Sequence, residues 1–171
     1  MHQFDDLIYR GTTFSLSALN KQLETSVLAL QTSGSTPDVK NLQMVQLQKA
    51  ILAIGMFSLY DSILQQKLSC PNGFSEAKRI LNKGGNNNLN EDFNNFILAI
   101  NVLKHGKGRS YDELLSRAGV LNFRLKLSGE DFFNYGDAAE VETLIEVDDN
   151  FVLNCAKIIG DVSEAIRVYK R

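Results

Sequence analysis

The residues whose types and spacing best suit chemistry lie around His105, one of two histidines in the chain. Asn101 precedes His105 by four residues, so both side chains project from one side of the same predicted helix. Three cations accompany the histidine in sequence: Lys104, Lys107 and Arg109. An imidazole that moves a proton beside cations that hold a phosphate suits acid–base chemistry at a phosphodiester. The same residues also fit an ordinary helix end with a solvated basic face, because Gly106 and Gly108 are typical helix terminators.

A second candidate is Asp61, the only charged residue between Ala50 and Leu64. A buried carboxylate needs a partner, because an isolated charge is expensive to remove from water. Asp61 is expected either to orient His105, to accept a hydrogen bond inside the helical core, or to lie at the rim of the core in contact with solvent.

Other catalytic and cofactor signatures are absent from the sequence. Gly84 and Gly85 are not followed by the Lys-Ser/Thr pair of a phosphate-binding loop. No His, Cys or acidic cluster has the spacing of a metal site, so neither a metal nor a cofactor is expected. Of the two cysteines, Cys155 falls on the apolar stripe of the last helix and is expected to be buried, whereas Cys70 is expected to be partly exposed.

The composition is that of an ordinary globular protein. The chain has 171 residues, 44% of them hydrophobic, and a formal net charge of −2. This length predicts a single domain spanning 1–171. The charge balance argues against a basic arm for non-specific nucleic-acid binding. The longest apolar run, Ala50 to Leu64, is interrupted by Asp61 and is shorter than the roughly 20 residues of a membrane span. We therefore expect no membrane association and a cytoplasmic location.

Apolar residues at spacings of three and four predict helices, and the candidate residues around His105 and Asp61 lie within or next to them. The first helix is expected to begin at Thr13 or Ser15, and the second, from Thr36 to about Leu68, is expected to be covered by neighbours on all sides from Ala50 onward. Further helices are predicted over about 74–83, from an Asn90 cap to Gly106, from a capping box at Ser110, and from about 150 to the C-terminus. Between about 120 and 147, alternating apolar residues favour a short β-hairpin-like or irregular excursion. The expected fold is therefore all-α in the main, a bundle of four to five core helices.

The helical order and the segment from Asn101 to His105 resemble the HEPN superfamily. Its motif is an arginine, a polar residue that is often asparagine, three variable residues and a histidine near the end of a core helix. Asn101 and His105 match this pattern, while Ile100 stands at the arginine position. The resemblance implies a HEPN-like bundle that forms a homodimer. It further implies metal-independent RNA cleavage with His105 in proton transfer, Asn101 beside it and Asp61 as the facing acid, with Lys104, Lys107 and Arg109 near the phosphate.

Because Lys and Arg are not interchangeable at a phosphate, the missing arginine opens a second hypothesis. In this hypothesis the chain is a catalytically degenerate dimerisation module whose Ile100 is buried in the dimer interface. Under the first hypothesis, the partners that the resemblance implies are RNA or a nucleotide and an antitoxin-like protein of a paired defence system. A third hypothesis is a small-molecule binder with a pocket closed by the 121–147 segment.

Overall fold

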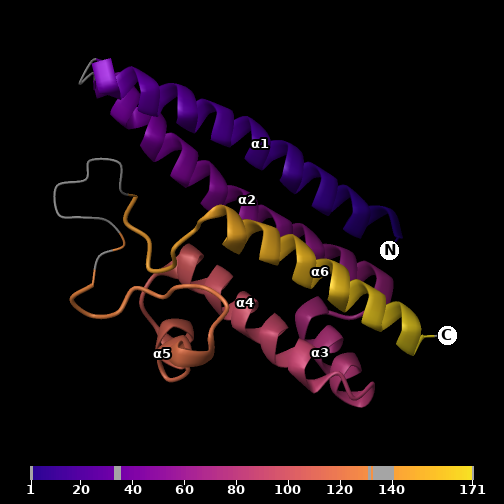
Figure 1. The fold of residues 1–171 in the computed structure, drawn as a ribbon. Helices are drawn as coiled ribbons and strands as arrows, with labels where there is room; N and C mark the ends of the chain where they lie inside the picture. Colours follow the sequence, from indigo (N-terminus) through magenta and orange to yellow (C-terminus); the bar gives the residue numbers. More distant parts are fainter. Residues whose placement is uncertain (1, 33–35, 131, 133–140, 171) are drawn as a thin grey trace.

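The computed structural model describes residues 2–32, 36–130, 132 and 141–170. Within these ranges the chain is all-α (Figure 1). Its helices are α1 (His2–Thr32), α2 (Thr36–Leu68), α3 (Gly73–Lys83), α4 (Asn87–His105), α5 (Arg109–Leu115), the short 3-10 helix η1 (Ala118–Val120) and α6 (Asp149–Tyr169). The sequence prediction of a mainly helical bundle is confirmed.

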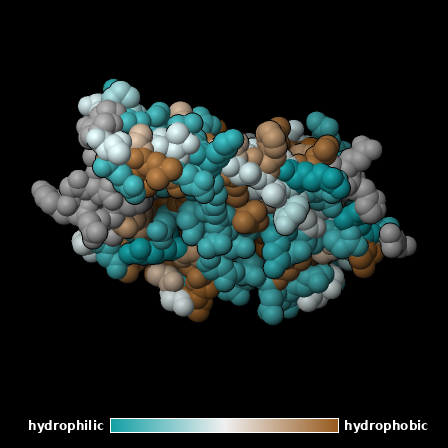
Figure 2. All heavy atoms as spheres, turned by 45° about the horizontal axis from the view of Figure 1, so that its top comes forward, coloured by the Kyte–Doolittle hydropathy of each residue, from teal (hydrophilic) through white to brown (hydrophobic). Residues whose placement is uncertain are grey.

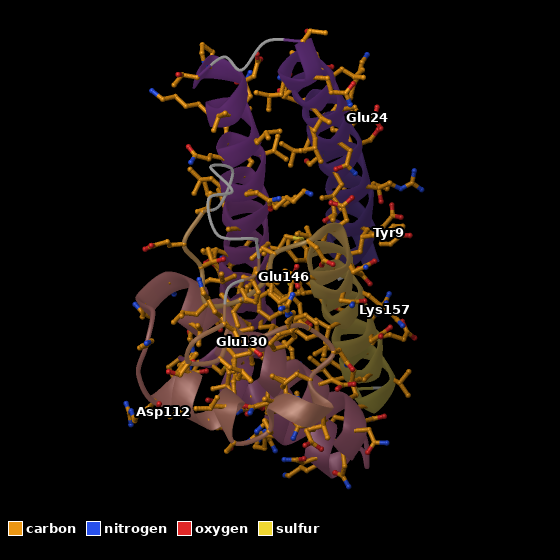
Figure 3. The ribbon with its side chains drawn as sticks, turned by 60° about the vertical axis from the view of Figure 1, so that its left-hand side comes forward. Tyr9, Glu24, Asp112, Glu130, Glu146 and Lys157 are labelled. Atoms are coloured by element: carbon orange, nitrogen blue, oxygen red, sulfur yellow. The ribbon has the colours of Figure 1, made fainter. Side chains whose placement is uncertain are left out.

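Three long helices, α1, α2 and α6, lie side by side, and the α3–α4 hairpin packs against α2 and α6 (Figure 1). Helices α1 and α2 form an antiparallel hairpin. The C-terminal end of α1 and the N-terminal end of α2 extend beyond α6 (Figure 3). Helices α2, α3, α4 and α6 supply most of the core, and α1 contributes the buried Leu16 with the partly buried Phe4 and Ile8.

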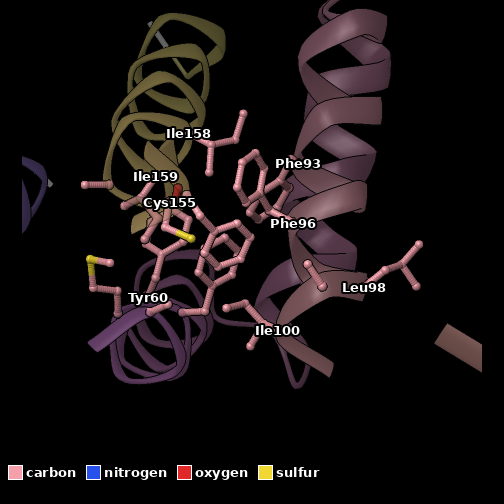
Figure 4. Close-up of a cluster of buried hydrophobic side chains, with 14 of the residues drawn as sticks. Tyr60, Phe93, Phe96, Leu98, Ile100, Cys155, Ile158 and Ile159 are labelled. Atoms are coloured by element: carbon pink, nitrogen blue, oxygen red, sulfur yellow. The ribbon is translucent and has the colours of Figure 1, made fainter. Parts of the chain in front are cut away.

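The core is built around stacked and tilted aromatic rings. The ring of Phe57 lies 6.3 Å from that of Phe93 and 6.5 Å from that of Phe96, measured between centroids. Phe96 in turn lies 5.6 Å from Phe151 of α6. Rings at these separations add stability beyond the area they bury. Cys155 is fully buried beside them, as predicted (Figure 4).

The first helix begins much earlier than predicted, at His2 instead of Thr13 or Ser15. The reason is packing: the ring of Phe4 stacks on that of Tyr60 at 6.1 Å, and the Thr12 hydroxyl lies 3.1 Å from the Met56 sulfur. These contacts with α2 hold the first three turns in helical form. The hydroxyl of Thr13 donates to the Tyr9 carbonyl within the helix instead of capping its start.

The prediction that α2 is covered on all sides from Ala50 onward is wrong. Ile51 is 50% exposed and Leu59 is 59% exposed, although Ala53, Met56 and Tyr60 are buried. In length and hydropathy α2 is the one helix, among the described residues, that resembles a membrane span. Its buried residues pack on α1, α3, α4 and α6, which is the environment of a core helix.

Two predicted helix starts are shifted. Helix α4 begins at Asn87, and the Asn90 side chain donates to Asn82 instead of capping the helix. Helix α5 begins at Arg109 after Gly108, with no side-chain hydrogen bond to its cap, so the predicted capping box at Ser110 does not form. In the excursion, the described residues contain one isolated antiparallel bridge, between Leu125 and Ile145. The excursion residues 131 and 133–140 lie outside the described residues.

Candidate functional site

The basic residues singled out in the sequence meet at the corner between α4 and α5. Helix α4 ends at His105, and Gly106 turns the chain with a φ of +73°, in the left-handed region that favours glycine. The side chains at this corner are exposed and make no hydrogen bond or ion pair with any described residue: Lys104, His105, Lys107 and Arg109. We call these four residues the α4–α5 corner. It presents three permanent positive charges and one imidazole to solvent.

Helix α5 holds this corner in place through two buried residues. Leu114 is fully buried, and the buried Tyr111 donates a hydrogen bond of 2.8 Å from its hydroxyl to the Lys126 carbonyl. Tyr111 therefore ties α5 to the excursion that precedes α6. Because the seven-residue helix would be marginal alone, its position depends on these tertiary contacts.

A polar network that the sequence analysis did not predict joins α3, α4 and α5 next to the α4–α5 corner. Arg117 donates to Glu113 at 2.9 Å and to the buried Asn95 at 3.2 Å. Lys78 of α3 donates to Asn94 at 2.8 Å. The only sequence signal was the pair of asparagines on the apolar helix α4, since buried amides need partners. Lys78 and Arg117 are therefore bonded within this network. In this region of the described chain, the unpaired cations are those of the α4–α5 corner.

The residues before His105 in the matched motif have different surroundings. Asn101 is half-buried on the same helix as His105, and its side chain makes no hydrogen bond to the described residues. Ile100 is only 4% exposed and lies inside the core (Figure 4). The expectation that Ile100 is buried in a dimer interface is therefore wrong, because the same chain already covers it. No cation occupies the position where the motif has its arginine.

Asp61 is engaged at the start of α3. One carboxylate oxygen accepts from the Phe74 backbone N–H at 3.1 Å, and the other accepts from the Gln65 amide at 2.7 Å. Gly73 allows this approach, since a Cβ there would come within 2.8 Å of the same carboxylate. Asp61 thus acts with Asn72, which accepts from Ser75, as a cap of α3.

The structure does not bring Asp61 and His105 together. Phe74, which Asp61 caps, has its ring 5.5 Å from Phe93 of α4. His105 lies twelve residues beyond Phe93 on that helix, which is about 18 Å at 1.5 Å per residue. Of the candidate residues, the structure thus groups His105 with the three cations, places Asn101 one helical turn away, and separates Asp61 from all of them.

An ion pair between a buried lysine and a half-buried aspartate, which the sequence analysis did not identify, joins the long helices. Lys49 of α2 is 5% exposed, and its ammonium lies 2.7 Å from Asp149 of α6, which also accepts from Asn20 of α1. Burial raises the pKa of Asp149, but the hydrogen bonds from Lys49 and Asn20 lower it by more, so its pKa lies below the ordinary 3.8. The available signal was the position of Lys49, four residues before Ala53 and the only charged residue between 41 and 60.

Lys49 also borders a small cavity between α2 and the segment before α6. The cavity has a volume of about 120 Å³ and is lined by these described residues: Gln46, Lys49, Phe132, Val141, Thr143, Glu146, Val147 and Asp148. Sites for drug-sized ligands usually measure about 300–1,000 Å³. The cavity is therefore too small for a nucleotide, and three of its lining residues carry carboxylates or hydroxyls instead of further cations.

Within the described ranges, no group of three or more His, Cys, Asp or Glu side chains gathers as a metal site would require. No family model, no curated protein sequence and no solved structure matches the chain.

Proposed function

We propose that this chain is a HEPN-like helical protein that binds RNA through the α4–α5 corner without cleaving it. The observation that carries the proposal is the set of four exposed side chains, Lys104, His105, Lys107 and Arg109, that have no partner among the described residues. RNA phosphates would supply the missing partners, and no native ion pair would have to break.

The arrangement suits a phosphate backbone better than an isolated nucleotide. The four residues of the α4–α5 corner lie within six consecutive positions, 104–109, at an exposed turn. Gly106 and Gly108 flank Lys107, so the backbone there can approach a phosphate closely. Acidic residues of α5 limit the positive field: Asp112 is exposed, while Glu113 is paired with Arg117. The expected binding is accordingly modest and salt-dependent.

Two observations argue against cleavage. The buried Ile100 leaves the motif without its arginine. Asp61 is engaged in capping α3 beside Phe93, and Phe93 lies about 18 Å along α4 from His105. His105 therefore lacks an orienting acid and a motif cation among the described residues, and phosphodiester cleavage needs charge stabilisation as well as proton transfer. In a paired toxin–antitoxin or defence system, such a protein would bind RNA as a degenerate member.

The test measures binding of a fluorescent single-stranded RNA by anisotropy, in EDTA, between 50 and 200 mM KCl. Three phosphate contacts predict a slope of log K against log salt of about −2, from about 0.7 per contact. The double change Lys107→Glu, Arg109→Glu should abolish most of the binding. Lys67→Glu, an exposed cation at the end of α2, is the matched control and should leave it unchanged.

A gel of the same reactions separates binding from catalysis, with His105→Ala as the comparison. Intact RNA with the native chain is the expected result. RNA cleaved by the native chain but not by His105→Ala would establish a metal-independent ribonuclease and overturn the non-cleaving part. Equal binding by the double variant would overturn the proposal as a whole.

A further inference from the structure

Helices α1 and α2 share an apolar strip that no described element covers. Its large side chains are Leu7 and Phe14 of α1, 64% and 77% exposed, with Ile51 and Leu59 of α2. Phe14 and Ile51 line one groove of about 340 Å³, together with Ser15, Ala18, Leu19, Gln48 and Leu52. We call Leu7, Gly11, Phe14, Ala18, Ile51, Gly55 and Leu59 the α1–α2 strip. Hydrophobic patches also interrupt the hydrophilic surface of the face seen in Figure 2.

The strip is free of charge. Neither 11–20 nor 50–60 contains Asp, Glu, Lys or Arg, and the preceding Lys49 is buried against Asp149. Solvent-facing protein surfaces usually carry about 25–35% charged residues, whereas the centres of protein interfaces are depleted of them. The exposed residues beside the strip are neutral and polar: Thr13, Ser17, Gln48 and Ser58. An apolar centre with a polar rim is the composition of a protein-binding surface.

The same neutral rim distinguishes a protein partner from a lipid surface. Helices that lie on membranes place Lys and Arg along the edges of their apolar face. Beside this strip, Arg10 is already bonded to Asp6 at 2.9 Å, and the other rim residues named above carry hydroxyls or an amide. Two identical charged surfaces would bring like charges together. A surface without charge can therefore bind a second copy of itself.

The shape of the strip is self-complementary, because it contains both a projecting side chain and a groove. The contact between Thr12 and Met56 places Gly11 and Gly55 at the same level of the hairpin, and a Cβ added at either glycine would meet open space. Phe14 projects one turn above them, beside the groove. A two-fold interface needs one patch to hold both the knob and the hole. With the axis parallel to the helices, each Phe14 faces the other copy's groove and each Gly11 faces a Gly55.

The face that contains the strip and its polar rim is large enough for this association. It extends along α2 from Met44, which is 41% exposed, to the exposed Ser62, about 27 Å, and two adjacent helices are about 20 Å wide. The resulting face of roughly 500 Å² per copy gives about 1,000 Å² in total, the size at which specific interfaces begin. We propose that two copies of this chain associate through the α1–α2 strip, with Phe14 of each copy in the groove of the other. This inference is independent of RNA binding.

Sedimentation velocity from 1 to 100 µM tests the proposal. The native chain should be a dimer at the upper end, and Phe14→Glu should raise the dimer dissociation constant at least tenfold. Val168→Glu on α6 is the matched control, since Val168 is 59% exposed and belongs to neither helix of the strip. It should leave the dimer intact. A native monomer at 100 µM, or a dimer unaffected by Phe14→Glu, would overturn the proposal.

Gly55→Leu gives a second test that a folding defect cannot mimic. Leucine raises helix propensity and meets open space in the monomer, so the melting temperature of the monomer should not fall. The added side chain should nevertheless weaken the dimer by preventing close approach of the helices.

Vesicle flotation of the native chain is the third measurement, and binding to neutral vesicles that is lost in Phe14→Glu would replace the second copy with a lipid surface. Retention of the dimer in the Lys107→Glu, Arg109→Glu variant, whatever its RNA affinity, keeps this result separate from the proposed function.

Discussion

Replacing Asp61 by alanine separates a structural acid from an orienting one. In the structure its carboxylate accepts from the Phe74 backbone N–H at 3.1 Å and from the Gln65 amide at 2.7 Å, both near the start of α3. Asp61→Ala should therefore destabilise the fold. The RNA affinity of the folded protein should remain that of the native chain, because the α4–α5 corner lies elsewhere.

The size of the loss follows from the two interactions removed. A lost N-cap acceptor costs about 0.5–2 kcal/mol, and a carboxylate at a helix N-terminus contributes about 0.3–1 kcal/mol. Asn72 still caps Ser75 at 2.9 Å, so the helix end keeps one of its two acceptors. We expect a decrease of about 1–2 kcal/mol in the free energy of unfolding. For a chain of this size that is about 2–8 °C in Tm, at about 2–4 °C per kcal/mol.

Urea denaturation and thermal melting measure the stability, and RNA anisotropy below the transition measures the site. Asn72→Ala is the matched control at the same helix end and should cost about 1 kcal/mol. Asp61→Asn keeps an oxygen acceptor without the charge and should lie between Asp61→Ala and the native chain. An Asp61→Ala protein of native stability with weakened RNA binding or altered RNA cleavage would refute the capping argument and restore Asp61 to the site.

Three further results are expected. Ile100→Asp should lower the free energy of unfolding by about 3 kcal/mol or more in urea, because it places an unpaired charge in the core, whereas Ile100→Val should cost about 0.5–1.5 kcal/mol; an Ile100→Asp chain of native stability would contradict the burial of that residue. Lys49→Met should be less stable than the native chain at pH 6, and the difference should shrink at pH 3. The lowered pKa of Asp149 stabilises the fold above the unfolded value near 4, and that stability is lost as the pH falls through the folded value; a difference that is constant with pH would argue against the ion pair. Tyr60→Phe should cost about 1 kcal/mol by removing the buried hydrogen bond with the Ser163 hydroxyl at 3.1 Å, and Tyr9→Phe on the exposed face of α1 should cost nothing measurable by thermal melting.

Local pattern was sufficient for the helices and for parts of the core. The three- and four-residue spacing of Phe93, Phe96 and Ile100 predicts the buried face of α4, and the same spacing places Cys155 in the core of α6. Helix starts were less predictable. Phe4 and Thr12 keep α1 helical through contacts with Tyr60 and Met56, residues more than forty positions away that a local cap signal at Thr13 does not register.

The sequence by itself determined which residues are apolar, how they repeat, and that His105 is followed closely by cations. Only the tertiary structure decided what lies against each of them. Ile100 is buried by its own chain, and the Asp61 side chain caps the start of α3. Lys49 pairs with Asp149, and Ile51 and Leu59 remain exposed. The physical reason is that periodicity defines the apolar face of a helix, whereas burial and pairing depend on neighbours contributed by distant parts of the chain.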